Sequence, residues 1–455
     1  MHYKITTSVS RNTVFALTLL LTLVTSSCAP SQVNIRGVHY LDAAISAGKW
    51  MISESAAGNA AAIPDRKNSD AVTAGLGEGA AGRALFFVEL FSATSDSLFL
   101  RSARVSAKTA MDLYEPNLGY GLYRGLSGVA AAASEVAEVT GDELLRELSL
   151  EAFIRIAEDS LNWGSVNDVL TGRAGVGLAL LYAWEHFQDE VFLSAATELG
   201  DHLLGLAETT EGNGLRWMRG QSMDFDLPNF SHGTAGIGYY FARLGEVSDE
   251  PRFVDAAIRA SNYLDLISDQ RNGLYLVPYG IPNEGFVTPF DIGWAHGPAG
   301  TGRFQYLMWS LNEQSTSEAK VRASAHTLMA SGMPGSSSDS TKWVGPFTID
   351  RRFGTSGAAS FLIDWGLASN DPSVVSFAGS VVDDILNQAN QIDDYLFWET
   401  PLYGFQTGEG KAVFTGYFYG AAGFGMLLLQ YHHALNGKVL RTRLPDDPFP
   451  TSSEW

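Results

Sequence analysis

The chain has 455 residues, of which 45% are hydrophobic and 18% charged, enough to bury one large core or two ordinary ones. Its 50 acidic residues outnumber its 30 basic residues and give a formal net charge of −20. Such a negative surface disfavours nucleic acid and anionic lipid as partners, and no basic run offers a phosphate-binding stripe.

The first segment is typical of export signals. Lys4 and Arg11 precede the mostly apolar run TVFALTLLLTLV at residues 13–24. A helix that spans a bilayer needs about 20 such residues, so this run is too short. Residues 1–27 are therefore predicted to be a secretory signal peptide.

Cys28, the only cysteine, directly follows this segment within VTSSCAP. Small residues before a lone Cys resemble a bacterial lipoprotein cleavage site, where the Cys becomes the lipidated first residue. The alternative is an ordinary signal peptide with an incidental Cys. We favour an exported lipoprotein of the cell envelope, at the outer membrane or facing the periplasm, that touches the membrane through its lipid only. Residues 28–36 are then a linker.

A Gly-x-x-Gly step followed by an apolar run recurs along the rest of the chain, as in SHGTAGIGYYFARLG from Ser231 and AHGPAGTGRFQYLMW from Ala295. Successive copies are 46, 47, 61, 64, 57 and 66 residues apart. This period indicates a repeat architecture. The first glycines of the seven copies are Gly79, Gly125, Gly172, Gly233, Gly297, Gly354 and Gly420.

Amphipathic helices are predicted before and between the copies, with apolar residues at three- and four-residue steps. They start near Gly37, Asp96, Asp142 and Glu250, with Asp96, Asp142 and Asp249 as expected N-caps. Each charged helix, followed by an all-apolar glycine helix, forms a predicted pair.

Seven such pairs predict an all-α fold, an α/α toroid of about seven inner and seven outer helices, over residues 37–440. Residues 441–455 are a predicted tail. The long loops before copies four to seven all enter inner helices at one end, so a binding site is expected at that mouth.

The residue just before each first glycine differs from copy to copy, so the repeat itself does not dictate it. These residues, expected to ring the mouth, are Glu78, Arg124, Thr171, His232, His296, Phe353 and Tyr419. Glu78, Arg124 and Tyr419 are predicted to contact substrate. The two histidines are either reactive groups or hydrogen-bonded packing residues, and His232 is the stronger candidate for a functional role.

Seven glycine steps in order, with NDVLTGRAGVG, SHGTAGIG and GWAHGPAGTG, resemble the lanthionine synthetase C-like family, which includes cyclases that build lanthionine bridges in peptides. The resemblance implies a fourteen-helix toroid. It also implies a zinc ion held by two Cys and one His, but Ala295, Arg352 and Phe353 stand at those positions here. Because these side chains cannot hold zinc, no cofactor is expected.

Two other positions of the resemblance persist. Asp168 matches the motif Asp, and His232 matches the His that protonates the enolate; Asp291 falls where the family has an Arg. With His296 and Asp291 as weaker candidates, a His–carboxylate pair can perform acid–base catalysis. The alternative for Asp168 is a helix cap. Trp294, beside the first lost ligand, is a further predicted substrate contact.

Three functions remain open at this point. The favoured one is an exported family member with a peptide-binding or non-cyclase activity. The second is a carbohydrate-active toroid enzyme, a hydrolase, lyase or epimerase that binds a carbohydrate or other small molecule at the mouth. The third is a non-catalytic scaffold. The sequence does not decide whether the protein is an enzyme, but it argues against a zinc-dependent lanthionine cyclase.

Lipidation can be tested directly. Cys28→Ser should block lipid addition, because no other thiol is available, and should leave soluble or unprocessed protein. Membrane fractionation and mass spectrometry of the mature N-terminus measure this. A variant that still partitions with membranes and carries the same lipid mass contradicts the prediction.

Overall fold

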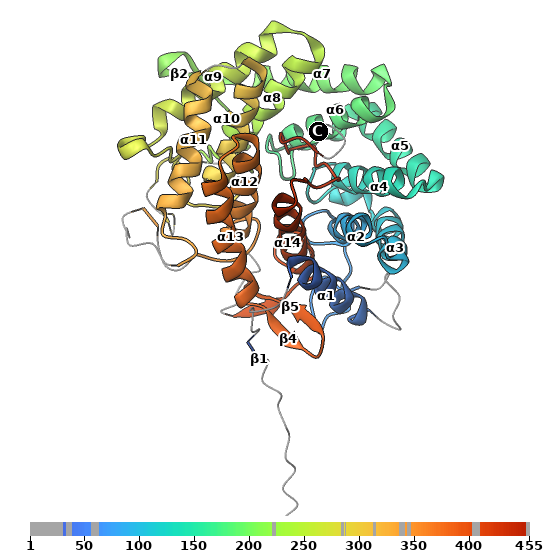
Figure 1. Cartoon of the computed structure of the whole chain (residues 1–455). Helices are drawn as coiled ribbons and strands as arrows, with labels where there is room; N and C mark the ends of the chain where they lie inside the picture. The colour runs from blue at the N-terminus through green and yellow to red at the C-terminus, as the bar shows by residue number, and fades with distance from the viewer. Residues whose placement is uncertain are drawn as a thin grey trace, which may run out of the picture.

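A computed structural model describes residues 31–32, 39–55, 63–220, 224–283, 286, 288–312, 315–335, 342–343, 347–402 and 410–451. The predicted signal peptide and Cys28 lie outside them. Within the described residues there are fourteen α-helices and seven short strands. The helices follow one another around a closed circuit (Figure 1), which confirms the predicted α/α toroid.

The inner ring consists of the seven glycine-step helices. Each packs on the next, and α14 packs on α2 to close the circle. Nearly every side chain is buried in such a helix, as in α4 from Leu126 to Ala137, because its neighbours cover it on all sides. The inner helices are α2 (Ala80–Thr94), α4 (Leu126–Thr140), α6 (Arg173–Phe187), α8 (Thr234–Ser248), α10 (Pro298–Asn312), α12 (Thr355–Ala368) and α14 (Ala421–Leu435).

The outer ring consists of half-buried helices that face water. In α3 the buried residues include Phe99, Ala103, Ala107 and Ala110, spaced three or four apart, so one face packs inward. The outer helices are α1 (Tyr40–Ser53), α3 (Ser97–Leu113), α5 (Glu143–Glu158), α7 (Glu190–Gly205), α9 (Pro251–Ile267), α11 (Ser315–Ala330) and α13 (Pro372–Asn387).

Two of the three predicted N-caps are confirmed. Asp96 accepts the Leu98 N–H at 2.8 Å, and Asp142 accepts the Leu145 N–H at 3.2 Å. The prediction for Asp249 is wrong, because it ends α8 in the left-handed conformation with φ 55°. The N-cap of α9 is Glu250, whose side chain makes no capping hydrogen bond, and the helix begins with Pro251.

The helices pair in space differently from the predicted order along the chain. Each inner helix packs mainly on the outer helix that follows it, as α2 does on α3. The first helix, α1, therefore has no earlier inner partner and packs on α14, the last. The two ends of the chain close the toroid together.

A ring of backbone hydrogen bonds joins the seven repeats just before the inner helices. In six steps, the residue two before the first glycine joins its counterpart in the next repeat, as when Tyr123 N–H donates to Leu170 C=O at 2.9 Å. At the remaining step Arg351, one residue earlier, donates to Phe418 C=O at 2.8 Å. The ring closes where Phe418 N–H donates to Gly77 C=O.

Short strands lie at the end of the toroid where the inner helices begin. β1 (Ser31–Gln32), inside the predicted linker, pairs antiparallel with β4 (Asn390–Ile392), which pairs with β5 (Tyr395–Phe397). Two further antiparallel pairs are β2 (Glu208–Thr210) with β3 (Gly214–Arg216) and β6 (Glu399–Pro401) with β7 (Lys411–Val413).

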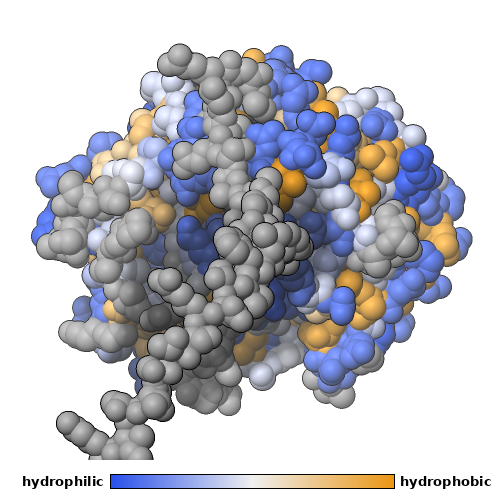
Figure 2. Space-filling model, turned by 90° about the horizontal axis from the view of Figure 1, so that it is seen from below, coloured by the Kyte–Doolittle hydropathy of each residue, from blue (hydrophilic) through white to orange (hydrophobic). Residues whose placement is uncertain are grey.

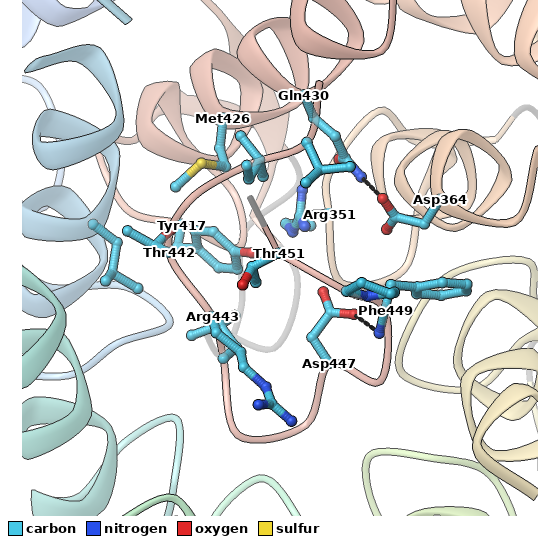
Figure 3. A pocket seen from close by; sticks show the side chains of 15 residues that line it. Arg351, Asp364, Tyr417, Met426, Gln430, Thr442, Arg443, Asp447, Phe449 and Thr451 are labelled. Carbon is cyan, nitrogen blue, oxygen red and sulfur yellow. Dashed lines mark hydrogen bonds between the residues drawn. The ribbon is translucent and has the colours of Figure 1, made fainter. Parts of the chain in front are cut away.

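The predicted tail enters the toroid from the opposite end, as far as Thr451 is described. Its backbone N–H groups at Arg441 and Thr442 donate to Glu89 in α2. Asp447 pairs with Arg303 in α10 at 2.6 Å. Figure 3 shows Asp447 and Arg443 on this tail among inner-helix side chains. The tail therefore belongs to the core of the toroid.

Among the described residues, which exclude the N-terminal segment, no helix is both long enough and apolar enough to cross a membrane.

The glycine requirement can be tested at Gly233. A Cβ there would lie 1.6 Å from the Leu227 carbonyl oxygen, a backbone atom that cannot move aside. Gly233→Ala should cost about 3 kcal/mol or more in the free energy of unfolding, measured by thermal or urea melts. In the control Gly205→Ala, at the end of α7, the Cβ meets nothing within 4 Å. That variant should be as stable as the original, and equal losses at both sites would refute the explanation.

Candidate functional site

The candidate site lies at the end of the toroid that carries β4 and β5. The seven residues directly before the first glycines are called the rim residues here. Successive rim residues contact each other, as Glu78 and Arg124 do at 3.0 Å and His232 and His296 do at 5.4 Å between ring centroids. In Figure 2, which views this end, the uncovered surface around the hollowed middle is mostly hydrophilic.

Asp168 is fully buried and fixed by four hydrogen bonds. Oδ1 accepts the N–H and the hydroxyl of Thr171, at 2.7 and 3.2 Å. Oδ2 accepts Arg219 Nε at 2.8 Å and His232 Nδ1 at 2.7 Å. Burial alone would raise the pKa of Asp168, but the hydrogen bonds, first of all from His232, lower it to about 2. The N-cap of α6 is Gly172, so the carboxylate orients His232 and does not cap the helix.

His232 is held as a neutral base. Burial lowers its pKa, and the charges of Arg219 and Arg352 lower it further, against the opposing effect of Asp168. With Nδ1–H donated to the carboxylate, Nε2 is the acceptor nitrogen. Nε2 lies 3.3 Å from Arg352 Nη2, so a cationic donor faces the basic nitrogen.

Arg352 links several rim residues. Its Nη1 donates to the Tyr419 hydroxyl at 3.0 Å, and its guanidinium lies over the Phe353 ring at 4.7 Å from the ring centroid. Burial raises the pKa of Tyr419 to about 12, so its hydroxyl stays protonated.

His296 lies beside this pair. Its ring stacks on Tyr279 at 4.0 Å, and burial together with His232 and Arg352 lowers its pKa well below the usual value. Burial raises the pKa of Asp291 to about 7. The charge of Asp350 raises this pKa further, and the charge of Arg352 lowers it. His296 and Asp291 are therefore both near Arg352. At neutral pH His296 is the uncharged imidazole, and Asp291 is partly protonated.

Trp294 has a different environment from the one predicted. Its indole N–H donates to Asp446 of the tail at 3.2 Å, and its ring packs on Tyr123. It is buried between the rim and the tail. The predicted substrate contact finds no support in this position, because the side chain holds the tail.

Sequence reasoning missed Arg219 and Tyr279, and treated Arg352 only as a lost zinc ligand. Arg219 and Tyr279 come from the long loops before α8 and α10. A signal existed for Arg219. The carboxylate of Asp168, if buried, needs hydrogen-bond donors, and the loop before α8 offers few cationic residues to supply them. No pattern pointed to Tyr279.

The zinc positions do not fit a zinc ion. Ala295 has no donor atom, Phe353 is apolar, and Arg352 brings a positive charge to the place of a thiolate. Within the described ranges, no group of three or more His, Cys, Asp or Glu residues gathers closely enough to hold a metal.

The sequence profile of the family described as "Lanthionine synthetase C-like protein" matches residues 70–441. The chain belongs to the lanthionine synthetase C-like family. The predicted resemblance is thus confirmed. No curated protein matches the chain.

Solved structures share the toroid. Nisin cyclase matches with a TM-score of 0.57 and 17% identity, over 80% of this chain and 89% of that one. The Lin0763 protein from Listeria innocua gives 0.51 and 12%, over 88% and 97%. The GH76A α-1,6-mannanase from Salegentibacter sp. HEL1_6 gives 0.49 and 10%, over 87% and 99%. At these identities the first two matches show the fold alone.

Asp168 should stabilise the protein in a pH-dependent way. Its lowered pKa of about 2, against an ordinary 3.8, corresponds to about 2 kcal/mol. This stability is present above pH ~4 and is lost as the pH falls towards the folded pKa. Asp168→Asn should therefore lower the unfolding free energy by about 2 kcal/mol at pH 7 and by less at pH 3.

Urea unfolding at the two pH values measures this difference. Asp112→Asn, which removes an exposed partner of Lys108, is the control and should cost about 0.5 kcal/mol or less. The free energy of unfolding of Asp168→Asn could instead differ from that of the original protein by the same amount at pH 3 as at pH 7. That result would argue against an ionised, hydrogen-bonded carboxylate.

Proposed function

We propose that the protein is an exported, lipid-anchored member of its family that binds a peptide at the toroid mouth and transfers protons on it. The observation that carries this proposal is the contact of 2.7 Å between His232 Nδ1 and the fully buried Asp168. Such a pair fixes the tautomer of the imidazole and leaves Nε2 as a general base.

The surroundings of Nε2 indicate a class of reaction. When a base removes a proton from carbon next to a carbonyl, negative charge develops on the carbonyl oxygen. The guanidinium of Arg352, 3.3 Å from Nε2, can stabilise that charge without a metal. His232 can then return the proton, so the proposed chemistry is proton transfer at a carbon beside a peptide carbonyl.

Absence of zinc is part of this proposal. Elemental analysis of the purified protein should find no stoichiometric zinc, because no thiolate or imidazole remains at the three family positions. One tightly held zinc per chain would overturn this, with His232 and His296 the first residues to test as its ligands.

A second candidate, a carbohydrate-active enzyme, is favoured by Asp291. A carboxyl group whose pKa burial raises to about 7 can act as a general acid, as in sugar hydrolysis. Release of reducing sugar from envelope polysaccharides, lost in Asp291→Asn, would support this candidate over the first.

The proton-transfer activity can be measured without knowing the natural substrate. Full-length protein in detergent is incubated with a mixed peptide library in D2O, and labile deuterium is then washed out in H2O. Peptides should keep an added mass of one deuterium at carbon, read by mass spectrometry. His232→Gln should reduce the rate about 100-fold or more.

His202→Gln is the matched control, because His202 is an exposed histidine on α7 and should not affect the rate. No deuterium incorporation by the unaltered protein refutes proton transfer on peptides and leaves the carbohydrate-active enzyme and the non-catalytic scaffold as the remaining candidates.

A further inference from the structure

Arg352 is a buried cation without an anionic partner. Its side chain is 9% exposed, and among the described residues no carboxylate oxygen lies within 4.0 Å of its guanidinium. Its polar contacts are the Tyr419 hydroxyl at 3.0 Å and His232 Nε2 at 3.3 Å. Its Nε–H has no hydrogen-bond partner.

Two other buried arginines are paired with carboxylates. Arg83 contacts Asp65 at 2.8 Å, and Arg303 contacts Asp447 at 2.6 Å. A buried charge is costly unless it is paired and hydrogen-bonded. Within the described part of the chain, the guanidinium of Arg352 contacts only aromatic rings and neutral polar groups. The buried Arg351 shares this lack of a carboxylate contact there, but on the side that faces the tail.

Nearby carboxyl groups do not replace the missing anion. Burial raises the pKa of Asp291 to about 7, and burial also raises that of Asp350. Asp350 uses its oxygens for the Phe353 N–H and the Thr348 hydroxyl. The carboxylate of Asp168 is occupied by Arg219 and His232. An anion from outside the chain is the group that this site lacks.

The buried, unpartnered edge of the guanidinium indicates the shape of that anion. Nε and Nη2 form one side of the planar group, which matches the two oxygens of a carboxylate. Nε is unpartnered, and Nη2 is engaged only by the 3.3 Å contact with His232. Nδ1 of His296, buried and also without a partner, adds a second unmet polar atom beside the rim.

We propose that Arg352 binds a carboxylate of a peptide ligand through its Nε–Nη2 edge, at the place where the family resemblance puts a zinc ligand. The carboxylate displaces His232 from Nη2 and frees its Nε2 to act as the base, while Nη1, which contacts the Tyr419 hydroxyl, is the nitrogen left for the reacting carbonyl oxygen. This inference rests on the proposed proton-transfer function, and it adds that the substrate is an acidic peptide, carrying either a free C-terminal carboxylate or an Asp or Glu side chain.

Binding of defined probes tests the proposal. Ligand-observed NMR with full-length protein in detergent measures Kd for N-acetyl-triglycine, for its C-terminal amide, and for the amidated peptide N-acetyl-Gly-Glu-Gly. At least one of the two carboxylate-bearing peptides should bind about tenfold or more tightly than the neutral amide. Which of the two binds distinguishes a C-terminal from a side-chain carboxylate.

Two variants assign the effect to the residue. Arg352→Gln should reduce binding of the preferred peptide to the level of the neutral amide. Arg351→Gln is the matched control: Arg351 is equally buried but contacts Ser360 and faces the tail, so its Kd should stay unchanged. Arg352→Lys keeps the charge but loses the two-nitrogen edge, and should give an intermediate Kd.

Several results would overturn the proposal. One is equal binding of acid and amide peptides by the unaltered protein, a measurement that needs no variant to fold. Others are an unchanged Kd in Arg352→Gln, or binding of methyl glucuronide in place of both acidic peptides, which would assign the site to an acidic sugar. Deuterium incorporation without carboxylate preference refutes this inference alone. Carboxylate binding without deuterium incorporation refutes the proton-transfer function alone.

Discussion

The closed ring of backbone hydrogen bonds before the inner helices is the constraint on which the rest of the toroid depends. Each repeat must bring its chain within hydrogen-bond distance of the next, as Ser231 does with Ala295. That approach leaves no room for a Cβ at the glycines beside it: one at Gly293 would lie 2.4 Å from the Phe353 backbone. Gly293 therefore serves the contact between repeats, whereas the first glycine of a Gly-x-x-Gly step, such as Gly233, lies against its own loop at the Leu227 carbonyl.

The same ring of backbone hydrogen bonds allows the rim residues to vary. Since backbone atoms make the ring, the rim side chains can change without breaking it, and the family scaffold can keep its shape while its chemistry changes. At the irregular step, Arg351 replaces Arg352 as the donor to Phe418. Arg352 then directs its side chain to His232 and Tyr419, and a cation stands where the resemblance implies a metal ligand.

The sequence predicted most of the fold, because glycine steps and three-to-four-residue apolar periods are local patterns. It also predicted that Asp168 and His232 belong together, through the motif that each matches. It could not predict Arg219 or Tyr279, since the paths of long loops depend on contacts made far along the chain. It could not predict the partner of the Trp294 indole either, because Asp446 lies 152 residues away in a tail without any periodic pattern.

The tail also bears on the order in which the molecule can fold. Its residues supply partners for Glu89 in the first inner helix and for Arg303 in the fifth. Helix α1 packs mainly on α14, the last helix. In an open solenoid each repeat can add to a finished neighbour. In this toroid α2 lacks one neighbour, and Glu89 lacks its donors, until α14 and the tail are in place. The first and the last repeats can therefore complete their cores only together.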